Sequence, residues 1–267
     1  MSTPATPAEG FPLSAAIAPR LQIVRTTNST NADVVAAVMA DAAAWPHLSV
    51  LLTYDQRAGR GRLDRTWTAP PGTALAVSVL VQVGGIPAAA RGWIPLAAGA
   101  AMTRAVLEQV RATGHSAGLK WPNDVLLDAG KVCGILAEVV PGQPDRVVIG
   151  AGVNTRMTAA DLPVETAISF PAVGLECDED RLLADYLTAL DELLAALATA
   201  DGDAAASGLL KTIDGLCTTI GSDVTVSLPD GTRLAGRAER IDPDGRLVVR
   251  SGEQVTIVSA GDVVHVR

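Results

Sequence analysis

The stretch QRAGRGRLDRTW, residues 56–67, is the most informative part of the sequence. Arginines occupy positions 57, 60, 62 and 65, so four of them fall within nine residues of a chain that is acidic overall. Glycine lets a backbone approach a ligand closely, and guanidinium groups bind carboxylate or phosphate oxygens in bidentate fashion. Trp67 could offer a flat face to a purine, although a core position explains a tryptophan at least as well. The stretch therefore predicts an anion-binding loop, with a solvated charged loop as the alternative.

The elements on either side of this stretch predict a mixed α/β domain. Buried strands are expected at 49–54 and 73–83, which leaves a loop of about 18 residues, longer than most connections and typical of functional segments. A capping pattern at Thr30-Asn31-Ala32-Asp33 opens a helix that should run to residue 45. Further strands are expected at 21–25, 119–121, 125–127, 132–140 and 146–153, and further helices at 94–113, 180–199 and 203–213.

The last fifty residues have a different character. From residue 223 onward, short alternating strands are separated by turn signals at 229–231 (PDG) and 242–245 (DPDG). Regular turn spacing of this kind indicates an all-β module, here a barrel of five strands. The sequence therefore divides into a flexible tail (1–20), an α/β domain (21–217) and a small barrel (218–267).

Composition argues against several classes of protein. The 267 residues are 48% hydrophobic, enough for a sizeable core, and the net charge of −8 argues against a general nucleic-acid surface, which needs clustered Lys and Arg. Cys133, Cys177 and Cys217 form no CxxC pair, so neither a disulfide framework nor a zinc site is expected. The sequence starts with no secretory signal and contains no 18-residue apolar run. We expect a soluble, cytoplasmic protein that binds neither nucleic acid nor membrane.

Four further segments combine polar residues with turns or interrupted strands. In KWPND (120–124) a turn follows a buried strand, so Lys120 can direct one positive charge into a site; an exposed lysine at a strand end is the alternative. Gly134 interrupts the apolar strand of KVCGILAE (131–138), which suggests a bulge or a ligand lying on the strand. The other two segments are NSTN (28–31) and GAGVN (150–154). The latter lacks the third glycine or alanine of a dinucleotide fingerprint, and the chain has no Walker motif.

In order and spacing, these five segments resemble the biotin–protein ligase family, from about residue 21 to residue 267. The resemblance implies a class II aminoacyl-tRNA synthetase-like mixed sheet with helices, which forms the catalytic biotin- and ATP-binding domain, and a C-terminal SH3-like β-barrel. It implies a ligase that uses ATP to form biotinyl-5′-AMP and transfers biotin to a lysine of a biotin carboxyl carrier domain of acyl-CoA carboxylases, with Mg²⁺ as a further cofactor. About 20 residues precede the first strand, too few for the N-terminal DNA-binding domain that some members carry.

The resemblance also assigns roles to individual residues. Those implied in biotin binding are Ser29, Thr30, Asn31, Gln56, Gly59, Arg60, Gly61, Arg62, Lys120 and Gly134. Those implied in ATP or adenine binding are Arg65, Trp67, Lys131 and Asn154, and those implied in catalysis are Arg62, Lys120 and Arg65. The resemblance identifies no metal ligands. The family usually has glycine where this chain has Asp64, which adds a charge and a side chain to the loop.

These residue types suit adenylate formation, in which a carboxylate must approach an α-phosphoryl group. Arg, Lys and Mg²⁺ can neutralise the two anions, and a closing loop can keep water from the mixed anhydride. Without a ligand we expect the loop to be poorly ordered, because its arginines repel one another. The alternatives are a lipoate- or octanoate-protein ligase or transferase of the same fold, a biotin-sensing DNA-binding repressor, and a non-catalytic carrier-binding module. The short N-terminal segment and low pI argue against the repressor, and the charged motifs argue against the module.

Overall fold

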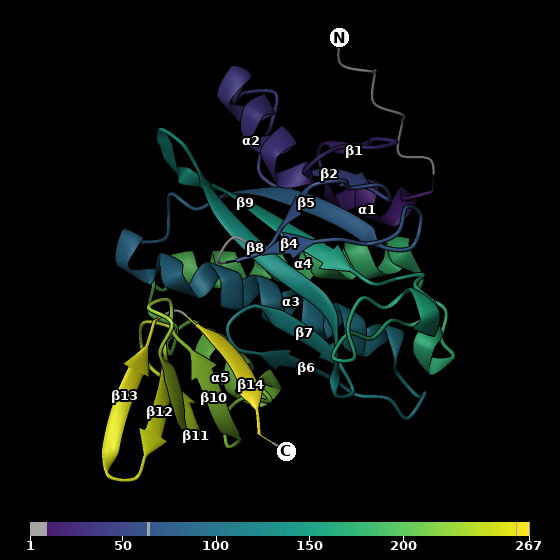
Figure 1. Cartoon of the computed structure of the whole chain (residues 1–267). Helices are drawn as coiled ribbons and strands as arrows, with labels where there is room; N and C mark the ends of the chain where they lie inside the picture. The colour runs from purple at the N-terminus through teal and green to yellow at the C-terminus, as the bar shows by residue number, and fades with distance from the viewer. Residues whose placement is uncertain (1–9, 63–64, 260, 267) are drawn as a thin grey trace.

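The computed structural model describes residues 10–62, 65–259 and 261–266. Its largest feature is a seven-stranded sheet in the order β1-β2-β5-β9-β8-β7-β6 (Figure 1). β1 and β2 are parallel and all other neighbours are antiparallel, so the sheet is mixed, as predicted. The strands are β1 (Leu21–Ile23), β2 (Ser49–Thr53), β5 (Leu75–Gln82), β6 (Ala117–Lys120), β7 (Asp124–Leu127), β8 (Gly130–Val140) and β9 (Gln143–Val153).

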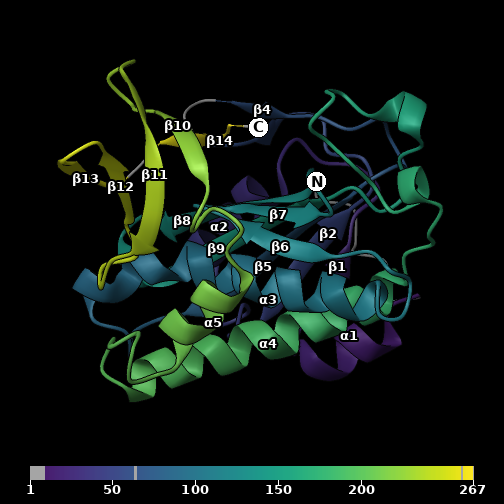
Figure 2. The same ribbon diagram turned by 90° about the horizontal axis from the view of Figure 1, so that it is seen from below.

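Helices cover one face of this sheet completely and the other only in part. The covered face carries α3 (Ile94–Gln109) and α4 (Glu179–Thr199), with α1 (Pro12–Ile17) and α5 (Leu209–Leu216) beside them (Figure 2). α3 is rich in alanine, and its small side chains allow it to lie close to both the sheet and α4. α2 (Thr30–Ala40) packs on the opposite face through Val34 and Val38, near β5 and β9, and leaves the rest of that face open. Short 3₁₀ turns lie at Ala88–Trp93, Ala159–Asp161 and Pro171–Val173.

The open part of the sheet has a floor of small residues. Side chains alternate between the two faces of a strand, so partners in the antiparallel pairing share a face. Ala76 of β5 and Gly134 of β8 both pair with Gly152 of β9, and Leu136 pairs with Gly150. Because three of these five residues lack a side chain, this face is hollow over β5, β8 and β9.

A second, five-stranded antiparallel sheet follows, as the turn spacing predicted. Its order is β13-β12-β11-β10-β14, which places β13 and β14 at its two edges (Figure 1). The strands are β10 (Asp223–Ser227), β11 (Arg233–Ile241), β12 (Leu247–Ser251), β13 (Gln254–Val258) and β14 (Asp262–His265). Two fully buried indoles join this sheet to the first domain: Trp93 Nε1 donates to Pro243 O at 2.9 Å, and Trp121 Nε1 donates to Gly245 O at 3.1 Å. The predicted turn at 242–245 is therefore also the attachment point of the second sheet.

Four local expectations need correction. α1 lies within residues 1–20, where we expected a flexible tail; Phe11 and Ala18 are buried, and Ser14 donates from Oγ to Asp180 Oδ1 at 2.8 Å. α2 begins after Ser29, whose Oγ accepts from Ala32 N, so Ser29 and not Thr30 is the N-cap. α2 also ends at residue 40, before the predicted 45, and α5 occupies 209–216 where 203–213 was predicted.

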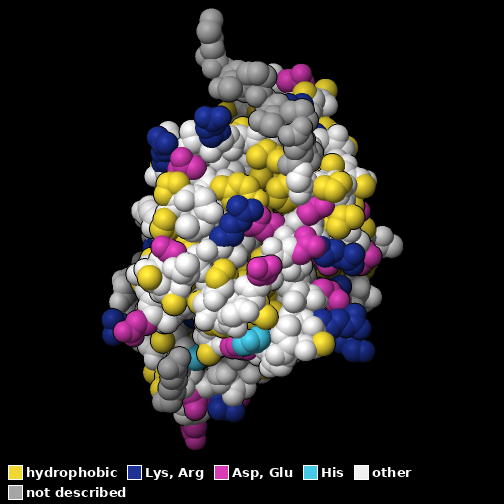
Figure 3. Space-filling view, turned by 90° about the vertical axis from the view of Figure 1, so that its right-hand side faces the viewer, with side chains coloured by type: hydrophobic (Ala, Val, Ile, Leu, Met, Phe, Trp, Pro, Cys, Tyr) yellow, Lys and Arg dark blue, Asp and Glu magenta, His cyan; other side chains and the backbone are white. Residues whose placement is uncertain are grey.

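Charged side chains are mixed on the face shown in Figure 3, where Lys and Arg stand beside Asp and Glu in small groups. None of the helices in the described part of the chain is long and apolar enough to cross a membrane.

Candidate adenylation site

A cavity lies on the open face of the seven-stranded sheet, above the floor of small residues. All five predicted motifs, from distant parts of the chain, contribute residues to its lining, and KWPND contributes Asn123 and Asp124. The lining residues are Ser29, Thr30, Asn31, Gln56, Arg60, Gly61, Arg62, Arg65, Thr66, Trp67, Ala76, Val77, Asn123, Asp124, Lys131, Gly134, Ile135, Leu136, Gly150, Ala151, Gly152 and Asp262.

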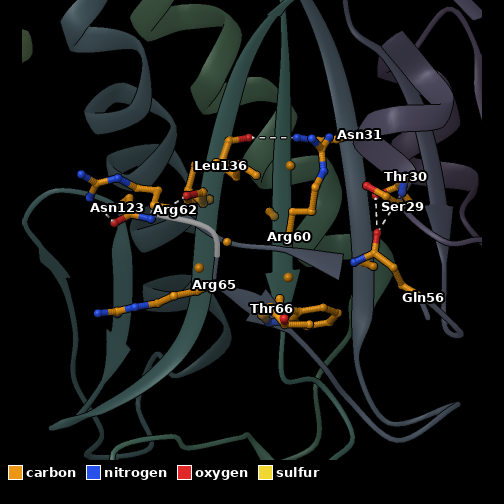
Figure 4. Close-up of a pocket in the computed structure, with 18 of the residues that line it drawn as sticks. Ser29, Thr30, Asn31, Gln56, Arg60, Arg62, Arg65, Thr66, Asn123 and Leu136 are labelled. Atoms are coloured by element: carbon orange, nitrogen blue, oxygen red, sulfur yellow. Dashed lines mark hydrogen bonds between the residues drawn. The ribbon is translucent and has the colours of Figure 1, made fainter. Parts of the chain in front are cut away.

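One corner of the cavity is built from hydroxyl and amide groups at the start of α2. Thr30 donates from both its backbone N and its Oγ1 to Gln56 Oε1, at 2.8 and 3.1 Å (Figure 4). The buried Ser78 Oγ lies 2.6 Å from Asn31 Oδ1 and 2.7 Å from Thr30 Oγ1. Asn31 Nδ2 donates to Leu136 O at 3.3 Å. These bonds fix the orientation of each group, so the corner presents a preorganised set of neutral donors and acceptors.

Gly150 makes this corner possible. A Cβ atom at Gly150 would collide with Asn31 Oδ1 and lie 3.0 Å from Asn31 Cγ. The glycine of GAGVN therefore lets the amide of Asn31 lie flat against the sheet, which explains one glycine that the sequence marked as a motif without giving its reason.

The remaining wall of the cavity carries cations, which begin beside Asn31, and each of them already has a partner in the protein. Arg60 pairs with Glu138 at 2.8 Å, and Glu138 also accepts from Asn31 Nδ2 at 2.7 Å. Arg62 Nη1 donates to Asn123 Oδ1 at 3.0 Å (Figure 4).

Two further pairs complete this cationic wall. Lys131 Nζ lies 2.6 Å from Asp124 Oδ1, and Arg65 pairs with Asp262 of β14, extending away from Arg60 (Figure 4). The mutual repulsion expected among the loop arginines is therefore offset by acceptors from β8, from the KWPND turn and from the second sheet. Because these partners are already in place, an entering anion must exchange with them.

The loop itself forms a small hairpin over the floor. β3 (Gly59–Arg60) pairs with β4 (Thr66–Trp67) in an antiparallel ribbon. The indole of Trp67 lies so close to Gly152 that a Cβ atom there would be 2.5 Å from Cε2 of the ring. The flat face predicted for a purine is thus held against the floor of the cavity. Asp64, the residue that departs from the family pattern, lies outside the described residues.

The two candidate lysines occupy different places. Lys131 lines the cavity, and its stem passes over Gly134, where a Cβ atom would lie 3.1 Å from Lys131 Cε and Nζ. Lys120 is not among the lining residues. Its burial lowers its pKa, and the nearby charges of Lys131 and Arg65 lower it further, while Asp124 acts in the opposite sense. Burial also lowers the pKa of Arg62. Lys120 therefore lies outside the lining residues but close enough to Asp124, Lys131 and Arg65 to interact with their charges.

Two other predicted site residues do not line the cavity. Gly59 is buried in the hairpin, where a Cβ atom would lie 2.5 Å from both Gln56 Nε2 and Trp67 O. Asn154 is buried, and its Nδ2 donates to Ile168 O at 2.8 Å and to Lys131 O at 3.4 Å. Both residues hold the site's backbone in place, and Asn154 fixes the chain beside Lys131.

The described residues contain no group of three or more His, Cys, Asp or Glu side chains placed to hold a metal ion. Asp124 and Asp262, which line the cavity, and Glu138 beside it each pair with a cation. The side chains that face the cavity therefore do not fit a resident metal.

Comparisons with known proteins agree with this architecture. The profile of the Biotin/lipoate A/B protein ligase family matches residues 23–154, and that of the biotin protein ligase C-terminal domain matches residues 219–266. A biotin–[acetyl-CoA-carboxylase] ligase of Mycobacterium tuberculosis is 38% identical over 251 residues, which are 93% of this chain and 90% of that protein. The chain belongs to the biotin protein ligase family.

Other members of the biotin protein ligase family match in part or in fold. A biotin–[acetyl-CoA-carboxylase] ligase of Paracoccus denitrificans is 41% identical over 133 residues, which are 48% of this chain and 51% of that protein. The solved biotin protein ligase of Aquifex aeolicus in complex with biotin and ATP shares the fold, with a TM-score of 0.73 and 21% identity over 93% of this chain and 99% of that one.

Several lining residues of this biotin protein ligase family member were missed in the sequence. Asn123 and Asp124 lie inside KWPND, where the lysine carried the only predicted role. Gly150 and Gly152 lie inside GAGVN, where the pattern of alternating glycines on a strand was itself the available signal. Asp262 of β14 had no signal, because nothing in the sequence brings the second sheet to the cavity.

Proposed function

We propose that this chain is an ATP-dependent ligase that forms biotinyl-5′-AMP and transfers biotin to a lysine of a biotin carboxyl carrier domain. The observation that carries the proposal is one cavity that combines two chemically different sets of groups. A corner of neutral donors and acceptors at Thr30 and Asn31 suits the ureido ring of biotin, and the cations suit its carboxylate and the phosphates of ATP.

In the first step the biotin carboxylate attacks the α-phosphorus of ATP, and pyrophosphate leaves. Two anions must come together, so neutralisation by fixed cations lowers the barrier, and no protein nucleophile is needed. We assign this role to Arg60, Arg62 and Lys131, which line the cavity, and to Arg65, which would exchange Asp262 for a phosphate. Lys120, which is not a lining residue, adds positive potential nearby. Trp67 and the floor at Gly152 would hold the adenine.

In the second step the neutral ε-amine of the acceptor lysine attacks the acyl carbon, and AMP leaves. Water would destroy the mixed anhydride, so the hairpin of β3 and β4 is expected to shield it until the acceptor arrives. Mg²⁺ enters the proposal as a companion of the ATP phosphates, because Mg²⁺ in such sites keeps substrate oxygens and water as ligands. The acceptor is proposed to be the biotin carboxyl carrier domain of an acyl-CoA carboxylase.

A test is acid-dependent pyrophosphate release. The purified chain is incubated with ATP and Mg²⁺, together with biotin, lipoate or octanoate, and pyrophosphate is measured before a carrier domain is added. The proposal predicts release with biotin alone, followed by biotin on one carrier lysine. Release with lipoate or octanoate but not with biotin would replace it with the related ligase activity, and no release with any acid would refute adenylation. Arg62→Ala is the matched variant, expected to lower release while the chain remains folded.

A further inference from the structure

A charged cluster outside the cavity remains unexplained by the proposed reaction. The carboxylate of Glu179, at the first turn of α4, is 8% exposed. Arg156 donates to it from Nε at 2.9 Å and from Nη2 at 2.5 Å, and Tyr54 Oη donates to it at 2.5 Å. The guanidinium of Arg156 also lies over the ring of Tyr54, 4.3 Å from its centroid. Three segments that are far apart in sequence thus meet at one buried carboxylate.

This cluster is located at the base of the loop that carries QRAGRGRLDRTW. Tyr54 is the last residue before the loop, and its carbonyl accepts from Gly72 N at 2.7 Å. Thr73, the next residue, accepts through its carbonyl from Arg156 N at 2.9 Å. The two ends of the loop are therefore hydrogen-bonded to each other, and the second end is also bonded to the backbone of Arg156. Two of the three residues of the cluster make these backbone contacts themselves.

The cluster is strongly bound together. A carboxylate with so little exposure costs free energy unless it is paired and hydrogen-bonded, and Glu179 has both kinds of partner. The hydrogen bonds that Arg156 donates to Glu179 raise the pKa of Arg156. Burial, followed by its own hydrogen bond to Glu179, raises the pKa of Tyr54, so both donors keep their protons. The bidentate fork of Arg156 and its stacking on Tyr54 need a planar guanidinium, which lysine cannot supply.

We propose that Tyr54, Arg156 and Glu179 are positioning residues for the adenylation site: they clamp the two ends of the loop and so set how firmly its hairpin covers a bound adenylate. The role in shielding an adenylate rests on the proposed function, whereas the clamp on the loop does not. Weakening the clamp leaves the lining residues unchanged but lets the hairpin open more often. Opening admits trypsin to the loop arginines and lets the adenylate escape.

Two conservative variants of the full chain test this role. Tyr54→Phe keeps the ring under Arg156 and removes one hydrogen bond to Glu179, and Arg156→Lys keeps the charge but removes the fork. The matched control is Ser14→Ala, which removes the bond from Ser14 Oγ to Asp180, the residue after Glu179, and touches no part of the loop. Trypsin cleavage after Arg57, Arg60, Arg62 and Arg65 is followed by mass spectrometry without ligand. In parallel, the KM for ATP, kcat and free biotinyl-AMP are measured.

The clamp predicts that trypsin cuts the loop of both variants roughly 3- to 10-fold faster than the loop of the wild type. This is less than the full equilibrium factor of a lost hydrogen bond to a charged group, because other contacts of the cluster remain. The KM for ATP and the released adenylate should rise by similar factors, with kcat changed less. Ser14→Ala should match wild type in all these readouts, whatever its thermal stability. Wild-type cleavage and adenylate retention in both variants would overturn the proposal, as would equal effects of Ser14→Ala. If the wild type formed no biotinyl-AMP while the cleavage pattern held, the proposed function would fail and the clamp on the loop would stand.

Discussion

Gly152 is the position where one added methyl group should separate nucleotide binding from biotin binding. A Cβ atom there would lie 2.5 Å from Cε2, 2.7 Å from Cζ2 and 2.8 Å from Nε1 of Trp67. Carbon atoms pack at about 3.5–4.0 Å, so the indole of Gly152→Ala must retreat by roughly 1 Å. Trp67 is half-buried on a hairpin at the surface, so the ring can move without disturbing the sheet.

The loss of ATP affinity depends on whether the bound nucleotide forces the displaced indole back against position 152 of the floor. Adding a methyl group to a well-packed position costs about 1–3 kcal/mol. In the empty protein the ring moves away, so the stability of the fold should change little. If the bound nucleotide needs the ring against the floor, the cost appears in ATP affinity, as roughly a 5- to 150-fold loss at about 1.4 kcal/mol per tenfold.

The assay is calorimetric titration with biotin and, separately, with a non-hydrolysable ATP analogue in the presence of biotin. Gly215→Ala is the control, because a Cβ atom at this helical position meets nothing within 4 Å. Gly150→Ala is the counterpart on the same strand: it collides with Asn31 and should weaken biotin binding instead. The reasoning would be refuted if Gly152→Ala bound the analogue as tightly as wild type, or if Gly150→Ala and Gly152→Ala weakened both ligands equally.

Three further predictions concern the charges around the cavity. Lys131→Ala should reduce biotin-dependent pyrophosphate release by a factor corresponding to ~3 kcal/mol or more, because it removes a charge that lines the site; Lys120→Ala should reduce it less, and the reverse order would contradict the placement of the two lysines. Because burial lowers the pKa of Lys120, its positive charge is lost as pH rises through a value below 10.5. The alkaline fall in pyrophosphate release should therefore begin at a lower pH in wild type than in Lys120→Arg, and coincident profiles would exclude a role for this charge. Asp262→Asn should lower the KM for ATP by no more than a few-fold, since Arg65 would no longer exchange a carboxylate in a partly exposed ion pair; a higher KM would show that Asp262 assists nucleotide binding.

The sequence predicted those parts of the protein that depend on local pattern. The alternating strands, the long loop and the five-stranded C-terminal module follow from periodicity and turn chemistry, and the structure confirms them. The roles of Arg60, Arg62 and Gly134 remain predictions, although all three residues line the cavity.

Features that depend on contacts between distant segments could not be predicted in this way. The pairing of Arg65 with Asp262 joins the loop to β14 of the second sheet, and α1 is held by Asp180, more than 160 residues away. The sequence favoured Lys120, at a strand end beside a turn, as the lysine that directs a charge into the site, whereas Lys131 lines the cavity, because only the path of the chain decides which side chain enters it. Gly152 was visible within GAGVN, but its contact with Trp67 depends on how the loop folds back over β9.

A crystal structure of the full chain soaked with biotin, ATP and Mg²⁺ tests the central claim most directly. We predict a single biotinyl-5′-AMP in the cavity, with its ureido ring at Thr30 and Asn31 and its adenine at Trp67 and Gly152. Arg65 should have left Asp262 for the phosphate. Biotin and ATP bound in separate places, or an adenylate anywhere but on the floor of β5, β8 and β9, would contradict the account.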